Sequence, residues 1–231
     1  MNIIITGGSR GIGREIALSL AEDRDNQIMV TGRDEGALRE TADSAANDNI
    51  SWFVVDLSDA SMQIKYLTER INSVFSIVDI LVNNAGTLVN KKFKDLRDDE
   101  IRLMMEVNYF APVNLVRSLL PLMRKGSHIL NISSMGGFQG SEKFEGLTCY
   151  SASKAALASL TECLAGELSL SGISVNCLAL GSVQTEMLTE AFPGYKAPVT
   201  AAEMGKFISY FALNGNKFFN GKILPVALTT P

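Results

Sequence analysis

Tyr150 and Lys154 stand four positions apart in a segment of helical periodicity, and this spacing places the phenol and the ammonium on one helix face. A nearby ammonium stabilises a phenolate, so it lowers the pKa of a tyrosine from about 10 toward the working range of a general acid or base. Alone, such a pair more often reflects packing beside a solvated charge. The rest of the chain must therefore indicate whether chemistry takes place here.

A glycine-rich turn follows the first apolar run of the chain. It reads Thr6-Gly7-Gly8-Ser9-Arg10-Gly11-Ile12-Gly13 and leads into a helical segment. In such a turn one glycine reverses the chain, one lets backbone amides approach a pyrophosphate, and one lets the helix pack tightly on the sheet. The alternative is a strand-to-helix turn without a ligand, but the position directly after the first strand favours a dinucleotide. We expect the cofactor to contact Gly7, Ser9, Arg10, Gly11, Ile12 and Gly13.

The residues after the second expected strand indicate which dinucleotide is bound. A site for NAD is expected to have an acidic side chain about 20 residues beyond the glycines, where it holds the ribose 2′-hydroxyl. This chain has Gly32 and then Arg33 there. Guanidinium groups at Arg33 and Arg10 suit the charged oxygens of a 2′-phosphate. We predict that NADP(H) is preferred and that NAD(H) remains possible; the alternative is that Arg33 is solvated and Asp34 or Glu35 faces the ribose.

Short apolar runs alternate with longer helical segments, which is the pattern of repeated βαβ units. Strands are expected near 2–6, 27–31, 51–55, 78–82, 127–132, 173–179 and 222–226. Helices are expected near 11–23, 34–46, 59–75, 98–124, 149–171 and 200–213. The pattern predicts an α/β fold, with a Rossmann-type doubly wound sheet of about seven parallel strands and helices on both faces. We expect one domain over residues 1–231, with substrate loops near 86–99, 135–149 and 181–199.

The composition excludes several classes of protein. The 231 residues are 46% hydrophobic and 20% charged with a net charge of −4, which argues against disorder and against binding to nucleic acid or an anionic membrane. No apolar run is long enough to span a bilayer. Three cysteines and one histidine, His128, show no metal-ligand spacing, so no metal site is expected, and a structural role is expected for His128. The odd number of cysteines favours a reduced, cytoplasmic protein.

Several ordered motifs resemble the short-chain dehydrogenase/reductase superfamily in its single-domain form, including members similar to 3-oxoacyl-[acyl-carrier-protein] reductases. The resemblance covers Asn2 to about Met187 and, more loosely, reaches Val226. Besides the glycine turn, the matching motifs are Asp56-Leu57, Asn83-Asn84-Ala85-Gly86, Val107-Asn108-Tyr109, Asn131-Ile132-Ser133-Ser134 and the Tyr150/Lys154 pair. The resemblance implies further cofactor contacts at Asp56, Leu57, Asn83, Ala85, Gly86, Tyr150, Lys154, Gly181, Val183 and Thr185.

The resemblance also implies a catalytic tetrad of Asn108, Ser134, Tyr150 and Lys154. In this scheme Tyr150 passes a proton to a carbonyl oxygen while NADPH delivers hydride to the carbon. In the reverse reaction Tyr150 acts as the base. Lys154 lowers the pKa of the tyrosine and holds the nicotinamide ribose. Ser134, chosen over Ser133, hydrogen-bonds the substrate oxygen. Asn108 anchors a water that links Lys154 to solvent.

The chain departs from the family pattern in four places. Tyr150 follows Ser134 by 16 positions rather than about a dozen, so residues 140–146 are expected to lengthen one wall of the substrate pocket without moving the tetrad. Leu180 replaces a proline before Gly181, and the loop after Thr185 is short. The last five residues, 227–231, replace the family's usual ending. That ending packs at a subunit interface in relatives, so its replacement argues against simply assigning the family's common tetramer. The resemblance implies a homo-oligomer, either a dimer or a tetramer.

The first functional hypothesis is an NADP(H)-dependent oxidoreductase that reduces a ketone, such as a 3-oxoacyl thioester, to a secondary alcohol or catalyses the reverse. Ser171 before Gly172 weakens the thioester assignment because carrier-protein reductases commonly have a basic residue there, although Arg124 and Lys125 could still meet an acidic carrier. The alternative within the family is a dehydrogenase of a sugar, a polyol or a secondary metabolite. From a different class, the chain could be a nucleotide-sensing protein without turnover, and the complete tetrad argues against this.

Overall fold

The computed structural model of this protein describes residues 1–228, including all their side chains except those of residues 60–62. Seven parallel strands form the main sheet: β1 (Asn2–Thr6), β2 (Gln27–Gly32), β3 (Ile50–Val54), β4 (Ile80–Asn83), β5 (His128–Ser134), β6 (Ser174–Leu180) and β9 (Ile223–Val226). Their order is β3-β2-β1-β4-β5-β6-β9. The predicted sheet is therefore confirmed, and its strand order reverses direction between β1 and β4, where such folds bind ligands.

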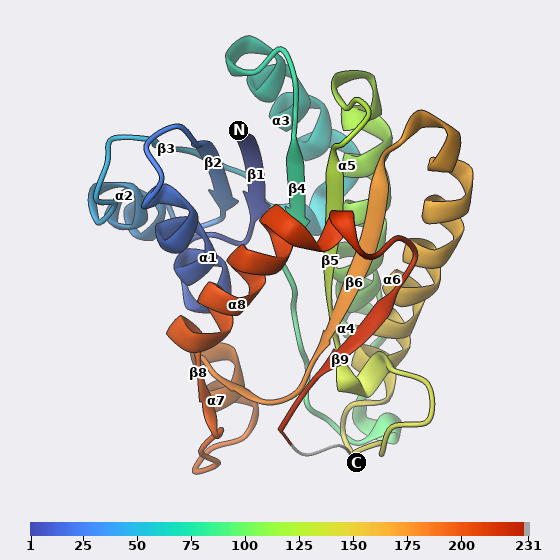
Figure 1. Ribbon diagram of the computed structural model, residues 1–231. Helices are drawn as coiled ribbons and strands as arrows, with labels where there is room; N and C mark the ends of the chain where they lie inside the picture. The colour runs from blue at the N-terminus through green and yellow to red at the C-terminus, as the bar shows by residue number, and fades with distance from the viewer. Residues whose placement is uncertain (229–231) are drawn as a thin grey trace.

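Helices cover both faces of the sheet (Figure 1). The helices are α1 (Gly11–Ala21), α2 (Glu35–Asp43), α3 (Ala60–Val74), α4 (Asp98–Met105), α5 (Ala111–Leu119), α6 (Thr148–Glu167), α7 (Glu186–Ala191) and α8 (Ala201–Asn214). Side chains of α1, α2 and α8 join the core on one face, and those of α3, α5 and α6 join the core on the other. The layers are those expected of a doubly wound fold.

The central strand β1 shows why both faces are covered. Ile3 and Ile5 point into the core beneath α1 and α8, whereas Ile4 points into the core beneath α3 and α5. All three side chains are fully buried, and burial of each contributes about 1.5–3 kcal/mol. A strand with apolar residues at every position must be covered on both sides. None of the helices among residues 1–228 is both long enough and apolar enough to cross a bilayer.

The helix predicted over 98–124 is divided into shorter pieces. A π-helical turn, η3 (Glu106–Phe110), separates α4 from α5, and the last turn, η4 (Leu120–Leu122), is a 3₁₀-helix. Pro112 cannot donate the hydrogen bond that an α-helix would direct to the carbonyl of Asn108, and Pro121 ends the helix in the same way. The Asn108 carbonyl therefore lacks the hydrogen bond from position 112 that a regular α-helix would provide.

The stretch 181–199 has more regular structure than the sequence indicates. It contains a short strand, β7 (Val183–Gln184), then α7, and then β8 (Val199–Thr200), which pairs in parallel with β7. Thr185 caps α7, since its hydroxyl accepts a hydrogen bond from the N–H of Leu188 at 3.3 Å. In Figure 1, β1 starts near the N-terminus at the top, while α7 and β8 lie toward the bottom, at the carboxyl edge of the sheet. Of the altered ending 227–231, residues 229–231 lie outside the described part.

Candidate active site

One cavity of about 620 Å³ lies at the carboxyl edge of the sheet and brings together most of the residues selected from the sequence. Its lining includes the predicted cofactor residues Gly7, Ser9, Arg10, Gly11, Ile12, Gly13, Arg33, Asp56, Leu57, Ala85, Gly86, Gly181, Val183 and Thr185. Ser134, Tyr150 and Lys154 line the same cavity. Asn83 and Asn108 do not line it.

The glycine turn forms an open cradle of backbone at the start of α1. Gly11 has a φ of 55°, in the left-handed region that favours glycine. A Cβ on Gly13 would lie 2.0 Å from the carbonyl oxygen of Gly7, so no side chain fits between the turn and the helix. Arg10, at the helix N-cap, provides no side-chain cap, and the first turn has no acidic residue. The free N–H groups and the helix dipole therefore fit a pyrophosphate.

Asn84, rather than Asn83, supports the glycine turn and lines the cavity. The Asn84 amide donates to the carbonyls of Thr6 at 3.0 Å and Gly7 at 3.2 Å. The Thr6 hydroxyl in turn accepts hydrogen bonds from the N–H groups of Asn84 and Ala85. Asn83 is buried in the sheet instead, where its amide donates to Oδ1 of Asn131 at 2.8 Å. The sequence motif contains both asparagines, and only the direction of β4 decides which one faces the cavity.

The acidic residues that could have faced an adenine ribose are occupied elsewhere. Asp34 caps α2 by accepting a hydrogen bond from the N–H of Ala37 at 3.0 Å, and Glu35 forms an ion pair with Arg39 at 3.3 Å. Neither carboxylate lines the cavity. The Arg33 side chain does line it, and it forms no ion pair with any residue of the described chain. A free guanidinium at the end of β2 therefore suits an anionic ribose substituent.

Ser134, Tyr150 and Lys154 meet where β5 ends and α6 begins. The Ser134 side chain lies next to the Tyr150 hydroxyl, where it lowers the pKa of the phenol. Lys154 is buried, donates from Nζ to the carbonyl of Ile132 at 2.9 Å, and lies 6.0 Å from the centre of the Tyr150 ring. The Ser133 hydroxyl is already used, since it donates to the carbonyl of Lys154 at 2.8 Å. Of the two serines, Ser134 is the one beside the tyrosine.

Burial shifts the pKa values of both the tyrosine and the lysine. It raises the pKa of Tyr150, and the hydrogen bond with Ser134 offsets only part of that rise. The lowered tyrosine pKa expected from the sequence is therefore wrong for the protein without cofactor, because desolvation of the phenolate outweighs its stabilisation. Burial also lowers the pKa of Lys154 to about 8. A partly neutral lysine stabilises a phenolate less than a fully charged one does.

Asn108 lies behind the cavity wall and orders the segment around the pair. Its Oδ1 accepts from the N–H of Thr87 at 2.8 Å, and its Nδ2 donates to the Thr87 carbonyl and to Oγ of Ser153, both at 2.9 Å. Ser153 donates onward to the carbonyl of Tyr150 at 2.7 Å. The side chain of Asn108 is thus fully used by protein groups. Its backbone carbonyl receives no hydrogen bond from Pro112, which has no N–H.

Apolar side chains gather at the end of the cavity beyond Ser134 and Tyr150. They come from the three predicted substrate loops and are Leu88, Met135, Phe144, Leu147, Met187, Phe192 and Tyr195. Phe144 belongs to the segment 140–146 that was expected to lengthen the wall. The described end of the chain also contributes Val226, Ala227 and Leu228 to the lining. The cavity thus has a polar end at the glycine turn and an apolar end formed by the loops.

The three loops are joined to one another. The Asn90 amide donates to the carbonyl of Ala191 at 2.8 Å, and the N–H of Lys91 donates to the carbonyl of Gly146 at 3.2 Å. Lys92 forms an ion pair with Glu145 at 3.2 Å. These contacts hold the loop 86–99 against both the segment 140–146 and α7. They fix the apolar walls relative to the tyrosine.

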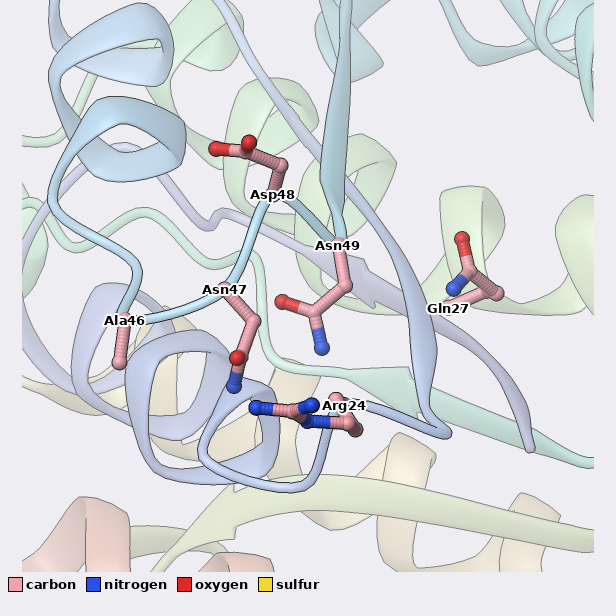
Figure 2. A pocket seen from close by; sticks show the side chains of 6 residues that line it. All are labelled: Arg24, Gln27, Ala46, Asn47, Asp48 and Asn49. Carbon is pink, nitrogen blue, oxygen red and sulfur yellow. The ribbon is translucent and has the colours of Figure 1, made fainter.

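A second hollow lies at the opposite edge of the sheet and contains no catalytic arrangement. Figure 2 shows its lining residues Arg24, Gln27, Ala46, Asn47, Asp48 and Asn49. Gln27 begins β2, and Asn49 directly precedes β3, so the hollow is at the amino ends of the strands. The Asn49 amide holds the carbonyls of Ala21, Asp23 and Asn26. We therefore assign this hollow to the structure of the α1–β2 connection.

Two features selected from the sequence also lie away from the cavity. Arg124 and Lys125 precede β5, so they are at the amino edge of the sheet, whereas the cavity lies at the carboxyl edge. His128 is buried, as its structural role requires. Its Nδ1 donates to the carbonyl of Ala212 at 2.9 Å, and its Nε2 accepts from Nδ2 of Asn176 at 3.1 Å.

The sheet, the glycine turn and the shared cavity together define a dinucleotide-binding α/β protein. The short chain dehydrogenase family matches residues 1–196. An uncharacterized oxidoreductase of Staphylococcus saprophyticus is 33% identical over 189 residues, which cover 80% of this chain and 79% of that protein. This chain belongs to the short-chain dehydrogenase/reductase family, and it is accordingly an NAD(P)-dependent oxidoreductase of CH–OH and C=O groups.

Solved structures agree with this assignment. A short-chain dehydrogenase/reductase from Serratia marcescens has a TM-score of 0.88 at 26% identity, covering 98% of this chain and 96% of that chain. A short chain dehydrogenase from Burkholderia cenocepacia, solved in complex with NADP, has a TM-score of 0.83 at 26% identity, covering 97% of this chain and 95% of that chain. The whole described fold is therefore the fold of this family.

Proposed function

We propose that this protein uses NADP(H) to reduce a ketone to a secondary alcohol, or to catalyse the reverse reaction, with Asn108, Ser134, Tyr150 and Lys154 as its functional tetrad. The observation that carries the proposal is that Ser134 and Tyr150 lie side by side and line the same cavity as the glycine turn. Proton transfer to a carbonyl oxygen needs a donor and an orienting hydroxyl at one point, and this pair provides both.

Each member of the tetrad has a separate task. Tyr150 donates its proton to the carbonyl oxygen, and Ser134 hydrogen-bonds the same oxygen and orients it. When bound, NADPH supplies the hydride that the carbonyl carbon receives. Lys154 holds the nicotinamide ribose and carries positive charge beside the phenol. Asn108 keeps Thr87 and Ser153 in position. In this proposal Asn108 also anchors, through its backbone carbonyl, the water that links Lys154 to solvent.

The preference for NADP(H) rests on the two arginines at the polar end of the cavity. Arg33 has no ion pair within the described chain, and Arg10 is on the adjacent glycine turn. The nearest acidic residues, Asp34 and Glu35, are used by α2. The NADP complex of the Burkholderia cenocepacia relative supports the same choice. The other cofactor contacts are those predicted from the sequence, with Asn84 in place of Asn83 beside the turn.

The apolar end of the cavity favours a ketone with an apolar chain, such as a 3-oxoacyl thioester, over a sugar or a polyol. A polyol needs several hydrogen-bonding side chains, because each buried hydroxyl without a partner costs about 1–3 kcal/mol. The lining beyond Ser134 consists mainly of leucine, methionine and aromatic side chains. These groups instead stabilise a hydrocarbon chain by about 25 cal/mol per Å² of apolar surface buried.

The experiment that tests this function is an assay panel followed at the absorbance of NADPH. Acetoacetyl thioesters, longer 3-oxoacyl thioesters, aromatic ketones and keto sugars are compared with the same enzyme preparation. We expect kcat/KM to rise with the length of the apolar chain and to be lowest for the sugars. Higher values for keto sugars would support the polyol alternative. Binding of NADPH without turnover of any carbonyl compound would support a nucleotide sensor instead.

We also propose that residues 1–231 form a single domain that holds both cofactor and substrate. The cofactor and substrate regions share one cavity at one sheet edge, and no second core is present within residues 1–228 apart from the two faces of that sheet. The expected homo-oligomer and cytoplasmic location are kept as part of the proposal. Sedimentation equilibrium of the purified protein measures the first of these directly.

A further inference from the structure

We infer that Glu190 is a specificity-determining residue that competes with the cofactor's 2′-phosphate for Arg10. The inference rests on the proposed binding of NADP(H), and it assigns a function to α7 that the tetrad does not include. Arg10 Nη1 lies 3.1 Å from Glu190 Oε1, and this ion pair joins the glycine turn to α7. The same arginine lines the polar end of the cavity. A cofactor phosphate that binds Arg10 must therefore displace this carboxylate or lie beside it.

The acidic face of α7 is turned toward the phosphate-binding turn. Glu186 and Glu190 stand four positions apart, so both carboxylates lie on one face of the helix. Glu186 lines the cavity, and its Oε2 would be 3.4 Å from a Cβ on Gly11. Two negative charges thus lie beside backbone that otherwise attracts anions.

Glu190 is held in place by its helix. Thr185 caps the first turn of α7, and the carbonyl of Ala191 accepts the hydrogen bond from Asn90. The end of α7 is therefore tied to the loop 86–99, which holds this end of the helix beside the cavity. The Glu190 carboxylate and the cofactor's 2′-phosphate thus compete for the guanidinium of Arg10.

Arg10 and Arg33, at the polar end of the cavity, therefore differ in whether an ion pair already occupies the guanidinium. Arg33 has no ion pair within residues 1–228 and is free for the 2′-phosphate, whereas Arg10 is already neutralised. The side chains of Arg10 and Glu190 are 51% and 66% exposed, so solvent weakens the pair without removing it. Exposed pairs of this kind correspond to about a two- to fivefold change in affinity. Glu190 thus lowers the preference for NADP(H) that Arg33 creates.

Two fragments of the cofactor isolate this effect. Adenosine 2′,5′-bisphosphate carries the 2′-phosphate, AMP lacks it, and neither reaches Tyr150, so catalysis and substrate loops do not contribute. Calorimetry measures both dissociation constants for the parent protein and for Glu190→Gln, Arg10→Ala, Arg33→Ala and the Arg10→Ala/Glu190→Gln double variant. Glu162→Gln is the charge-matched control, because Glu162 is exposed on α6 and does not line the cavity.

We expect Glu190→Gln to tighten the bisphosphate about two- to fivefold, to leave AMP unchanged, and to have no effect in the Arg10→Ala background. A merely structural role for Glu190 would shift both fragments equally and overturn the inference. If Glu190→Gln leaves the affinity for the bisphosphate unchanged while Arg33→Ala still weakens it, the proposed competition is overturned. The cofactor proposal then remains intact. If the parent binds AMP as tightly as the bisphosphate, the NADP(H) proposal fails and this inference falls with it.

Discussion

Lys154 reaches the carbonyl of Ile132 rather than any carboxylate, and its Nζ stands 6.0 Å from the centre of the Tyr150 ring. Within residues 1–228 the buried ammonium on α6 has no ion-pair partner, and burial lowers its pKa to about 8. Burial of this charge beside the phenol therefore lowers the free energy of unfolding. Two pH-dependent properties and two properties of the site follow from the arrangement.

The first prediction concerns the alkaline stability of the cofactor-free protein. The unfolded state keeps Lys154 protonated up to about pH 10.4, whereas the folded state releases the proton near pH 8. The unfolded state therefore binds more protons between these values, and stability rises with pH. We expect the parent to gain about 1 kcal/mol relative to Lys154→Met between pH 7 and pH 9. Urea unfolding of both proteins measures the difference, and parallel pH curves would contradict it.

Tyr150→Phe tests the proton donor. Removal of a positioned general acid lowers turnover by about 10²–10⁴-fold, whereas the phenyl ring keeps the shape of the site. We expect the variant to bind NADPH within about twofold of the parent, because the glycine turn and the arginines are unchanged. Tyr210→Phe is the matched control, since Tyr210 is exposed on α8 away from the cavity. Unchanged turnover in Tyr150→Phe would contradict proton donation by Tyr150.

Arg33→Ala tests the choice of cofactor. The loss of one charge-assisted contact to the 2′-phosphate corresponds to about a tenfold weaker affinity for NADPH, and the affinity for NADH is expected to stay the same. Arg39→Ala serves as the control, because Arg39 is on α2 in an ion pair with Glu35 and does not line the cavity. Fluorescence titration with both cofactors measures the four constants. Tighter binding of NADH than NADPH by the parent would show that this assignment is wrong.

His128 makes the fold sensitive to mild acid. Burial lowers the pKa of His128 to about 4, because desolvation penalises the charged ring by more than the hydrogen bond to the Ala212 carbonyl stabilises it. Protonation would also remove the lone pair with which Nε2 accepts from Asn176. The unfolded histidine takes up its proton near pH 6.5. Stability should therefore fall as the pH drops from about 6.5 to 4, by about 2 kcal/mol at pH 5.

The control for this prediction is His128→Gln, which has no proton to gain in that range. His128 is the one histidine of the chain, so the variant removes histidine titration altogether. Its unfolding free energy should depend less steeply on pH between 7 and 5 than that of the parent. Equal slopes for the two proteins would assign the acid sensitivity to carboxylates.

The sequence alone determined the sheet, the glycine turn and the identity of the Tyr150/Lys154 pair. Strand-length apolar runs such as Ile3 to Ile5 require cover on both faces, and glycine at position 13 reflects a contact that no side chain permits. These are local properties, in which neighbouring residues in the chain carry the whole signal. For the same reason, Pro112 and Pro121 could have indicated the division of the helix expected over 98–124.

Only the tertiary structure decided the features that depend on distant residues. The direction of β4 decides that Asn84, and not Asn83, faces the cavity. Burial by surrounding elements sets the pKa of Tyr150 and Lys154 against the expectation from their spacing. The pairing of Arg10 with Glu190 joins residues 180 positions apart. Spacing along the chain indicates which residues share one face of a helix or strand. Desolvation and contacts between residues distant in the sequence exist only once the elements have packed.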